Sequence, residues 1–131
     1  MTLLSIVLLM TQSSAATCLK YDIDVVVVGK LIEQTFPEQP NYESIEKGDV
    51  PATYYFLDPS PALCVLPGSG PDERAADIDS LQIVFPANGD AYKALRSSLG
   101  RDVKCTGRLM PEISGHHHTP ILLADAVCAP R

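Results

Sequence analysis

The sequence lacks the short motifs by which common enzyme and metal sites are recognised. Its four cysteines form no C-x-x-C pair, which excludes a thioredoxin-like redox site and a zinc knuckle. No serine lies in a G-x-S-x-G motif, and the stretch PGSGP at residues 67–71 has the spacing of neither a phosphate loop nor a dinucleotide-binding loop. We therefore expect a protein that is not an enzyme.

Basic residues are scarce as well. Ten Lys and Arg stand against sixteen Asp and Glu, which gives a formal net charge of −6. An acidic surface repels phosphate backbones, so we expect no nucleic-acid partner. The charge is uneven, with ten acids and two bases in residues 33–79 but one acid and five bases in residues 93–108. Either a polar partner uses this asymmetry or both regions are simply solvated faces.

No apolar run is long enough to span a bilayer, which takes about 20 residues. Residues 3–10 are apolar, and small residues follow just before Cys18. This pattern is typical of a secretory signal peptide over residues 1–16 with cleavage before Thr17, although the usual opening Lys or Arg is missing. A buried or membrane-spanning segment and a lipoprotein leader are the alternatives. We expect a periplasmic or secreted protein without a membrane span after cleavage, folded as a single domain over residues 17–131.

The four cysteines, Cys18, Cys64, Cys105 and Cys128, fit an oxidising compartment, where two structural disulfides are the default. Three pairings are open from their number alone. Eleven prolines in so short a chain argue against a helical protein and favour strands joined by loops.

Apolar and polar residues alternate in five or six segments, which predicts strands. A surface loop is expected over residues 67–77, and one helix over residues 88–99, with Asn88 or Asp90 as its cap and Gly100 after its end. The predicted strands cover residues 21–33, 53–57, 62–66, 81–85, 101–109 and 121–128. In the first strand Gly29 marks a bend, and one face carries Tyr21, Ile23, Val25, Val27 and Leu31.

The element order predicts a mainly β protein, a small OB-fold-like barrel of five to six strands with one helix between strands 3 and 4. A β-sandwich, which needs about seven strands, is the alternative. The last strand is expected to turn Leu122, Ala124, Ala126 and Cys128 inward. Cys105 and Cys128 then face the core from neighbouring strands, which favours a disulfide between them.

An OB-fold binds ligands between the loop after its first strand and the loop between its last two strands. These loops are expected at residues 35–50 and 110–120. The first offers Asn41, Tyr42 and Glu43 as ligand-binding side chains. Alternatively, Tyr42 packs under a long loop with its hydroxyl bonded to the backbone.

The second loop contains all three histidines of the chain, His116, His117 and His118. In an extended segment His116 and His118 point the same way, and with a carboxylate such as Glu112 they fit a zinc, copper or nickel site. Alternatively, the loop is a turn in which one histidine bonds the backbone and the others are solvated. Histidines also permit a response to pH.

The segments FPEQPNYESIEKGDVPATYYFL, PALCV, GRDVKCTGRL and GHHHTPILL resemble an uncharacterised family of bacterial periplasmic or secreted OB-like domains. Its recurring pieces are an N-Y-E-S loop, a P-x-C-V strand and a G-H-H-H-T box. The resemblance implies a bacterial origin. It also implies that Cys18 and Cys64, at recurring positions, form one disulfide and that Cys105 and Cys128 form an additional one.

Taken together, these features favour a secreted or periplasmic, disulfide-bonded, non-enzymatic binding module. Its expected ligand is an envelope protein that it inhibits or neutralises, recognised by the face between the two polar loops. The alternatives are a zinc- or copper-binding domain centred on the histidines and a purely structural domain.

Overall fold

The computed structural model describes residues 17–85 and 90–131 as a mainly β domain. The predicted signal peptide over residues 1–16 and the predicted cap Asn88 lie outside these residues. No helix in the described part of the chain is long and apolar enough to cross a membrane.

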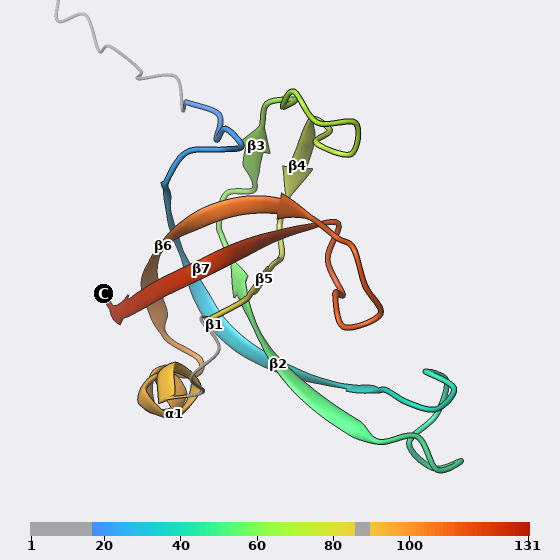
Figure 1. Cartoon of the computed structure of the whole chain (residues 1–131). Helices are drawn as coiled ribbons and strands as arrows, with labels where there is room; N and C mark the ends of the chain where they lie inside the picture. The colour runs from blue at the N-terminus through green and yellow to red at the C-terminus, as the bar shows by residue number, and fades with distance from the viewer. Residues whose placement is uncertain (1–16, 86–89) are drawn as a thin grey trace, which may run out of the picture.

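Five strands form a closed barrel: β1 (Val25–Pro37), β2 (Pro51–Asp58), β5 (Leu81–Ile83), β6 (Asp102–Pro111) and β7 (Ile121–Pro130). Their order around the barrel is β1-β2-β5-β7-β6 (Figure 1). Neighbours run antiparallel except β5 and β7, which pair in parallel. With a helix between the third and fourth barrel strands, this is an OB-fold-like arrangement, and the predicted fold class is confirmed.

The predicted helix is present but less regular than expected. An α-helix, α1 (Asp90–Leu95), continues into a 3₁₀ turn, η1 (Arg96–Ser98). Leu95 is buried and packs into the core, which fixes the helix to the barrel. Gly100 follows with φ of +81°, a left-handed conformation that glycine adopts without strain.

Strand β1 serves two partners and begins later than predicted. Residues 25–30 pair with β6 and residues 30–37 pair with β2. At the change of partner, a Cβ on Gly29 would lie 3.0 Å from backbone atoms of Asp58 and Pro59, so any larger residue would push against that backbone. The predicted buried face is confirmed except at Ile23. Asp22 turns with φ of +63°, which breaks the alternation and leaves Ile23 half exposed.

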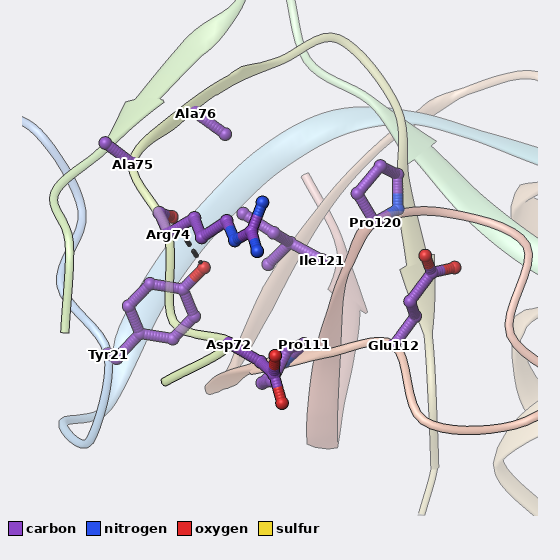
Figure 2. A pocket seen from close by; sticks show the side chains of 9 residues that line it. All are labelled: Tyr21, Asp72, Arg74, Ala75, Ala76, Pro111, Glu112, Pro120 and Ile121. Atoms are coloured by element: carbon purple, nitrogen blue, oxygen red, sulfur yellow. Dashed lines mark hydrogen bonds between the residues drawn. The ribbon is translucent and has the colours of Figure 1, made fainter. Parts of the chain in front are cut away.

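A small second sheet, β3 (Leu63–Val65) and β4 (Ala76–Ile78), lies beside the barrel (Figure 1). Strand β4 overlaps the end of the predicted surface loop at residues 76 and 77, because so short a strand gives no usable alternation. The buried Tyr21 joins the N-terminal segment to this region, since its hydroxyl donates a 2.9 Å hydrogen bond to the carbonyl of Arg74 (Figure 2).

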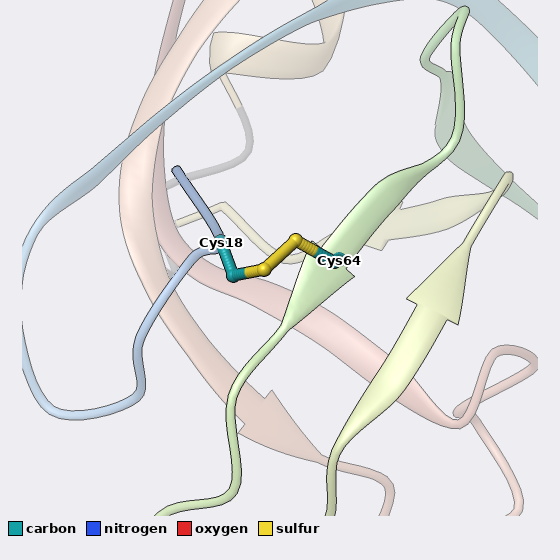
Figure 3. Close-up of a disulfide and its surroundings, with 2 residues drawn as sticks. All are labelled: Cys18 and Cys64. Carbon is teal, nitrogen blue, oxygen red and sulfur yellow. A yellow bond between two sulfur atoms is a disulfide. The ribbon is translucent and has the colours of Figure 1, made fainter. Parts of the chain in front are cut away.

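Both predicted disulfides are confirmed. Cys18 is bonded to Cys64 on β3, with 4.8 Å between the Cα atoms, and ties the N-terminal segment to the small sheet (Figure 3). Cys105 and Cys128 are direct partners across β6 and β7, with 4.0 Å between the Cα atoms. A covalent bond therefore reinforces each of the two sheets.

The inward face of β7 differs from the prediction. The core contains Ile121, Leu123 and Ala126, and Asp125 between them has φ of +50°. An irregularity in the pairing with β6 at this point shifts the alternation by one residue. Leu122 is buried, but on the opposite face of the strand from Leu123, and the expected inward position of Ala124 is wrong.

Candidate binding site between two loops

A row of side chains on the outer wall of the barrel is buried. Phe56, Gln82 and Leu122 are register partners on β2, β5 and β7, and each is at most 1% exposed. Their chain neighbours point into the core, so these three point outward. An outward polar side chain with so little exposure indicates that another segment covers the row.

That segment is the loop between β6 and β7, residues 112–120, here called the histidine loop. Gln82 binds it at two backbone positions: its Nε2 donates to the carbonyl of His116 at 2.9 Å, and its Oε1 accepts from the amide of His118 at 2.6 Å. The amide of Gln82 donates to Thr119 Oγ1 at 3.1 Å. One buried residue of β5 thus holds the loop against the wall, satisfying polar groups that are costly to bury alone.

The second loop, residues 38–50 between β1 and β2, is here called the acidic loop. Its organiser is the buried Asp49, whose carboxylate accepts 2.8 Å hydrogen bonds from the amides of Asn41, Glu43 and Ser44. The amides of Ser44 and Glu43, with that of Asn41, hold the pKa of Asp49 below its ordinary value. The loop is therefore closed on itself around one carboxylate.

Glu38, at the start of the acidic loop, joins the two loops. Its carboxylate is 6% exposed and accepts a hydrogen bond from the Tyr54 hydroxyl at Oε1. His116 Nδ1 lies 3.1 Å from Oε2, and His118 Nε2 lies 3.8 Å from Oε1. Despite these approaches, Oε2 and His118 Nε2 are buried without a hydrogen bond of ordinary geometry.

The electrostatics of this cluster favour an ionised carboxylate. Burial alone raises the pKa of Glu38, but the hydrogen bond from Tyr54 and the contact with His116 outweigh it and lower the pKa. Burial and the adjacent Glu38 carboxylate both raise the pKa of Tyr54, so its hydroxyl keeps its proton and donates. The result is a negative charge held at the junction of the two loops.

Aromatic contacts complete the junction. Phe36 at the end of β1 stacks on His118 with 3.7 Å between ring centroids, and also packs against Phe56 at 5.9 Å. Tyr42 approaches His116 edge-on at 6.4 Å. Such contacts add to the burial of apolar area and make the two loops one surface.

Of the predicted ligand-binding residues, Tyr42, His116 and His118 come together. Asn41 and Glu43 supply backbone amides to Asp49 and expose their side chains. His117 faces elsewhere, because its Nδ1 accepts a 3.0 Å hydrogen bond from the amide of Ile113. Burial and the nearby His116 lower the pKa of His117. For His117, the alternative of a turn histidine bonded to the backbone is therefore correct.

The described residues offer no set of ligands for the predicted metal site. Within residues 17–85 and 90–131 no group of three His, Cys, Asp or Glu side chains is arranged to hold a metal ion. Glu112 forms no such group with His116 and His118 at the junction of the loops. It lines a pocket elsewhere, where Figure 2 shows it beside Pro120 and opposite Tyr21 and Arg74. Its charge acts on His117, whose pKa it raises against the larger effect of burial.

Sequence reasoning missed three residues that build the site: Glu38, Tyr54 and Gln82. The alternation of β2 carried a usable signal for Tyr54, because its neighbour Tyr55 is a core residue and adjacent side chains face opposite ways. Nothing in the local sequence around Glu38 indicates that a loop 78 residues further along the chain closes over it (116 − 38 = 78).

A shallow pocket of about 280 Å³ opens at the junction. The acidic loop exposes three apolar side chains, here called the apolar rim: Tyr42 and Ile45 are each 43% exposed, and Val50, which lines the pocket, is 59% exposed. The pocket is lined by Glu38, Gln39, Val50, Ala52, Tyr54 and His116. A pocket lined by an acidic side chain, with exposed apolar side chains on the same loop, is suited to binding another molecule.

Comparisons with known proteins give one similarity. Residues 80–127 match the model of a family described as "Domain of unknown function (DUF4431)". The match spans the histidine loop and Gln82, whereas Glu38 and the acidic loop precede it. No curated protein and no solved structure matches the chain. Over this segment the chain is therefore similar to an uncharacterised family, as its motifs predicted.

Proposed function

We propose that this protein is a secreted or periplasmic, non-enzymatic binding module whose ligand is another protein of the cell envelope. The observation that carries the proposal is the Glu38 junction. It joins two sequence-distant loops into one surface with a charged pocket and an apolar rim. The position agrees with the ligand-binding face of OB-like barrels. A role as an inhibitor or an immunity-type protein follows for a module that binds a partner without transforming it.

The two disulfides support the compartment. Disulfides persist in oxidising surroundings and are rare in cytosolic proteins, and this protein has two. The apolar rim supports a protein partner, because exposed aromatic and aliphatic side chains are the usual anchors of protein interfaces. Tyr42, Ile45 and Val50 supply such a rim.

Site-directed photo-crosslinking tests the proposal. A photo-reactive residue at Val50 should capture a discrete envelope protein in living cells, and purified partner should then bind the isolated protein in calorimetry. The matched control is Val127, which is 70% exposed and lies on β7, seven residues beyond the end of the histidine loop at Pro120 (127 − 120 = 7).

The rim itself is tested by Tyr42→Ala combined with Ile45→Ala. This pair should weaken the affinity for the captured protein at least about tenfold, while Val127→Ala leaves it unchanged. Equal capture from Val50 and Val127, or unchanged affinity of the rim variant, would show that this face is not the interface.

A further inference from the structure

We propose that the pocket at the junction of the two loops, which Glu38 lines and which is here called the Glu38 pocket, binds one cationic side chain. This arginine or lysine would be presented by a basic segment of the partner. The inference rests on the proposed use of this face for binding and specifies the chemistry that the partner must supply. Three observations carry it: the state of the Glu38 carboxylate, the walls of the pocket and the charge of the acidic loop.

Glu38 is buried, yet it is one of the residues that line an open pocket. Oε1 already accepts from Tyr54, whereas Oε2 has no hydrogen bond of ordinary geometry. A buried carboxylate oxygen whose close neighbour, His116 Nδ1 at 3.1 Å, makes no well-formed hydrogen bond is costly, because burial removes the water that would otherwise solvate it. A donor entering the pocket would remove that cost.

The groups that contact Glu38 in the structure do not carry a permanent positive charge. Its ion-pair partners among the described residues are the imidazoles of His116 and His118, which carry charge only when protonated. A guanidinium or an ammonium group is charged throughout the physiological pH range. Charge-assisted hydrogen bonds to a carboxylate are about twice as strong as neutral ones.

The walls match the shape of such a side chain. Val50 and Ala52 offer apolar surface to the methylene groups of an arginine or lysine stem. The rings of Tyr54 and His116 lie beside the carboxylate, and a guanidinium stacks on aromatic faces. The pocket is thus lined by apolar groups, aromatic rings and one acidic side chain.

The surrounding charge selects for a basic partner. Within residues 38–50 there are four acids, Glu38, Glu43, Glu46 and Asp49, and one base, Lys47. Complementary charge raises the association rate and suppresses acidic competitors. A basic segment with one side chain inserted beside Glu38 satisfies both the pocket and the loop.

Titration with short peptides, followed by amide chemical shifts in NMR, tests the inference on the intact disulfide-bonded protein. The probes are acetyl-Gly-Gly-X-Gly-Gly-amide with X as arginine, lysine or citrulline, the last being a neutral isostere of arginine. We expect saturable shifts at Glu38, Val50, Ala52 and Tyr54 with arginine or lysine, and at least about tenfold weaker binding with citrulline.

Variants locate the effect. Glu38→Gln should weaken binding of the cationic peptides at least about tenfold, whereas Glu43→Gln, an exposed acid of the same loop, should change it less than about twofold. Ala52→Leu keeps the carboxylate but fills the pocket, so it should weaken binding even if Glu38→Gln disturbs the loop.

The inference is overturned by three results: equal binding of citrulline and arginine peptides, no saturable shift with any peptide, or unchanged binding in both Glu38→Gln and Ala52→Leu. The peptides need no natural partner. If crosslinking from Val50 succeeds and the peptides do not bind, only the inference about a cationic side chain is wrong. If the peptides bind and no protein is captured, only the proposed function is wrong.

Discussion

The ring of His118 lies parallel to the ring of Phe36, with 3.7 Å between their centroids and 3° between their planes. Phe36 is the penultimate residue of β1 and is paired with Ala52 on β2, whereas His118 belongs to the histidine loop. The stack therefore locks the loop between β6 and β7 to the far end of the β1–β2 hairpin. Changes that release the histidine loop should also loosen the acidic loop.

Gln82→Leu should release the histidine loop. The leucine leaves the His118 amide and the His116 carbonyl buried without their partner, which we expect to cost about 2–4 kcal/mol of unfolding free energy. Hydrogen exchange of residues 113–119 should accelerate. Gln34→Leu on the exposed face of β1 is the matched control. Unchanged exchange in the Gln82 variant would show that the clamp does not hold the loop.

Tyr54→Phe should destabilise the junction by about 1–3 kcal/mol, because the buried Glu38 carboxylate loses its donor. The pKa of Glu38 should rise in the same variant, since the bond from Tyr54 is one of the causes that lower it. Urea unfolding and carbon-detected titration of Glu38 measure the two effects. Tyr42→Phe serves as the control. If the pKa of Glu38 in Tyr54→Phe equals that in the wild type, the hydrogen bond from Tyr54 does not stabilise the ionised carboxylate.

Glu38 should make the protein sensitive to acid. Its folded pKa lies below its unfolded value of about 4.3, so its ionised form stabilises the fold above that pH. This contribution is lost as the pH falls through the folded pKa. Urea unfolding between pH 5 and pH 2 should therefore show a smaller loss of stability in Glu38→Gln than in the wild type. Parallel curves of unfolding free energy against pH for the two proteins would show that the ionised form of Glu38 does not stabilise the fold.

Removing either disulfide should destabilise the protein by about 3–4 kcal/mol through the entropy of the unfolded chain. Cys18 and Cys64 are separated by 46 residues and Cys105 and Cys128 by 23, so loop length favours the first bond by about 0.6 kcal/mol. Guanidinium unfolding of the two double-alanine variants compares them. Loss below 1 kcal/mol for both would mean that the barrel is self-sufficient.

Alternation in the sequence predicted the barrel strands because each has one face in the core. Val25, Val27 and Leu31 on β1 and Val103 and Cys105 on β6 give regular spacing of buried residues. The pattern failed where the backbone breaks it, at Ile23 after the left-handed Asp22 and at Ala124 beside the left-handed Asp125. The turn at Asp22 displaces Ile23 alone, because Val25 and Val27 return to the predicted face, whereas the irregularity at Asp125 moves the following residues of β7 to the other face.

The candidate site was predictable only in its position. The OB-like order indicated the two loops, and the histidines and Tyr42 stood out by residue type. Glu38 and Gln82 did not, because an acid before a loop and a glutamine in a strand are ordinary on a surface. Both are buried here and contacted by the histidine loop, which is distant from them in the sequence.

The bond between Cys18 and Cys64 has a practical consequence. It anchors the start of the described chain beside β3, whereas the acidic loop lies at the opposite end of the molecule (Figure 1). A biotin or a surface tether fused ahead of Thr17 would thus hold every copy in one orientation. The junction around Glu38 would point away from the support, ready to meet whatever is passed across it.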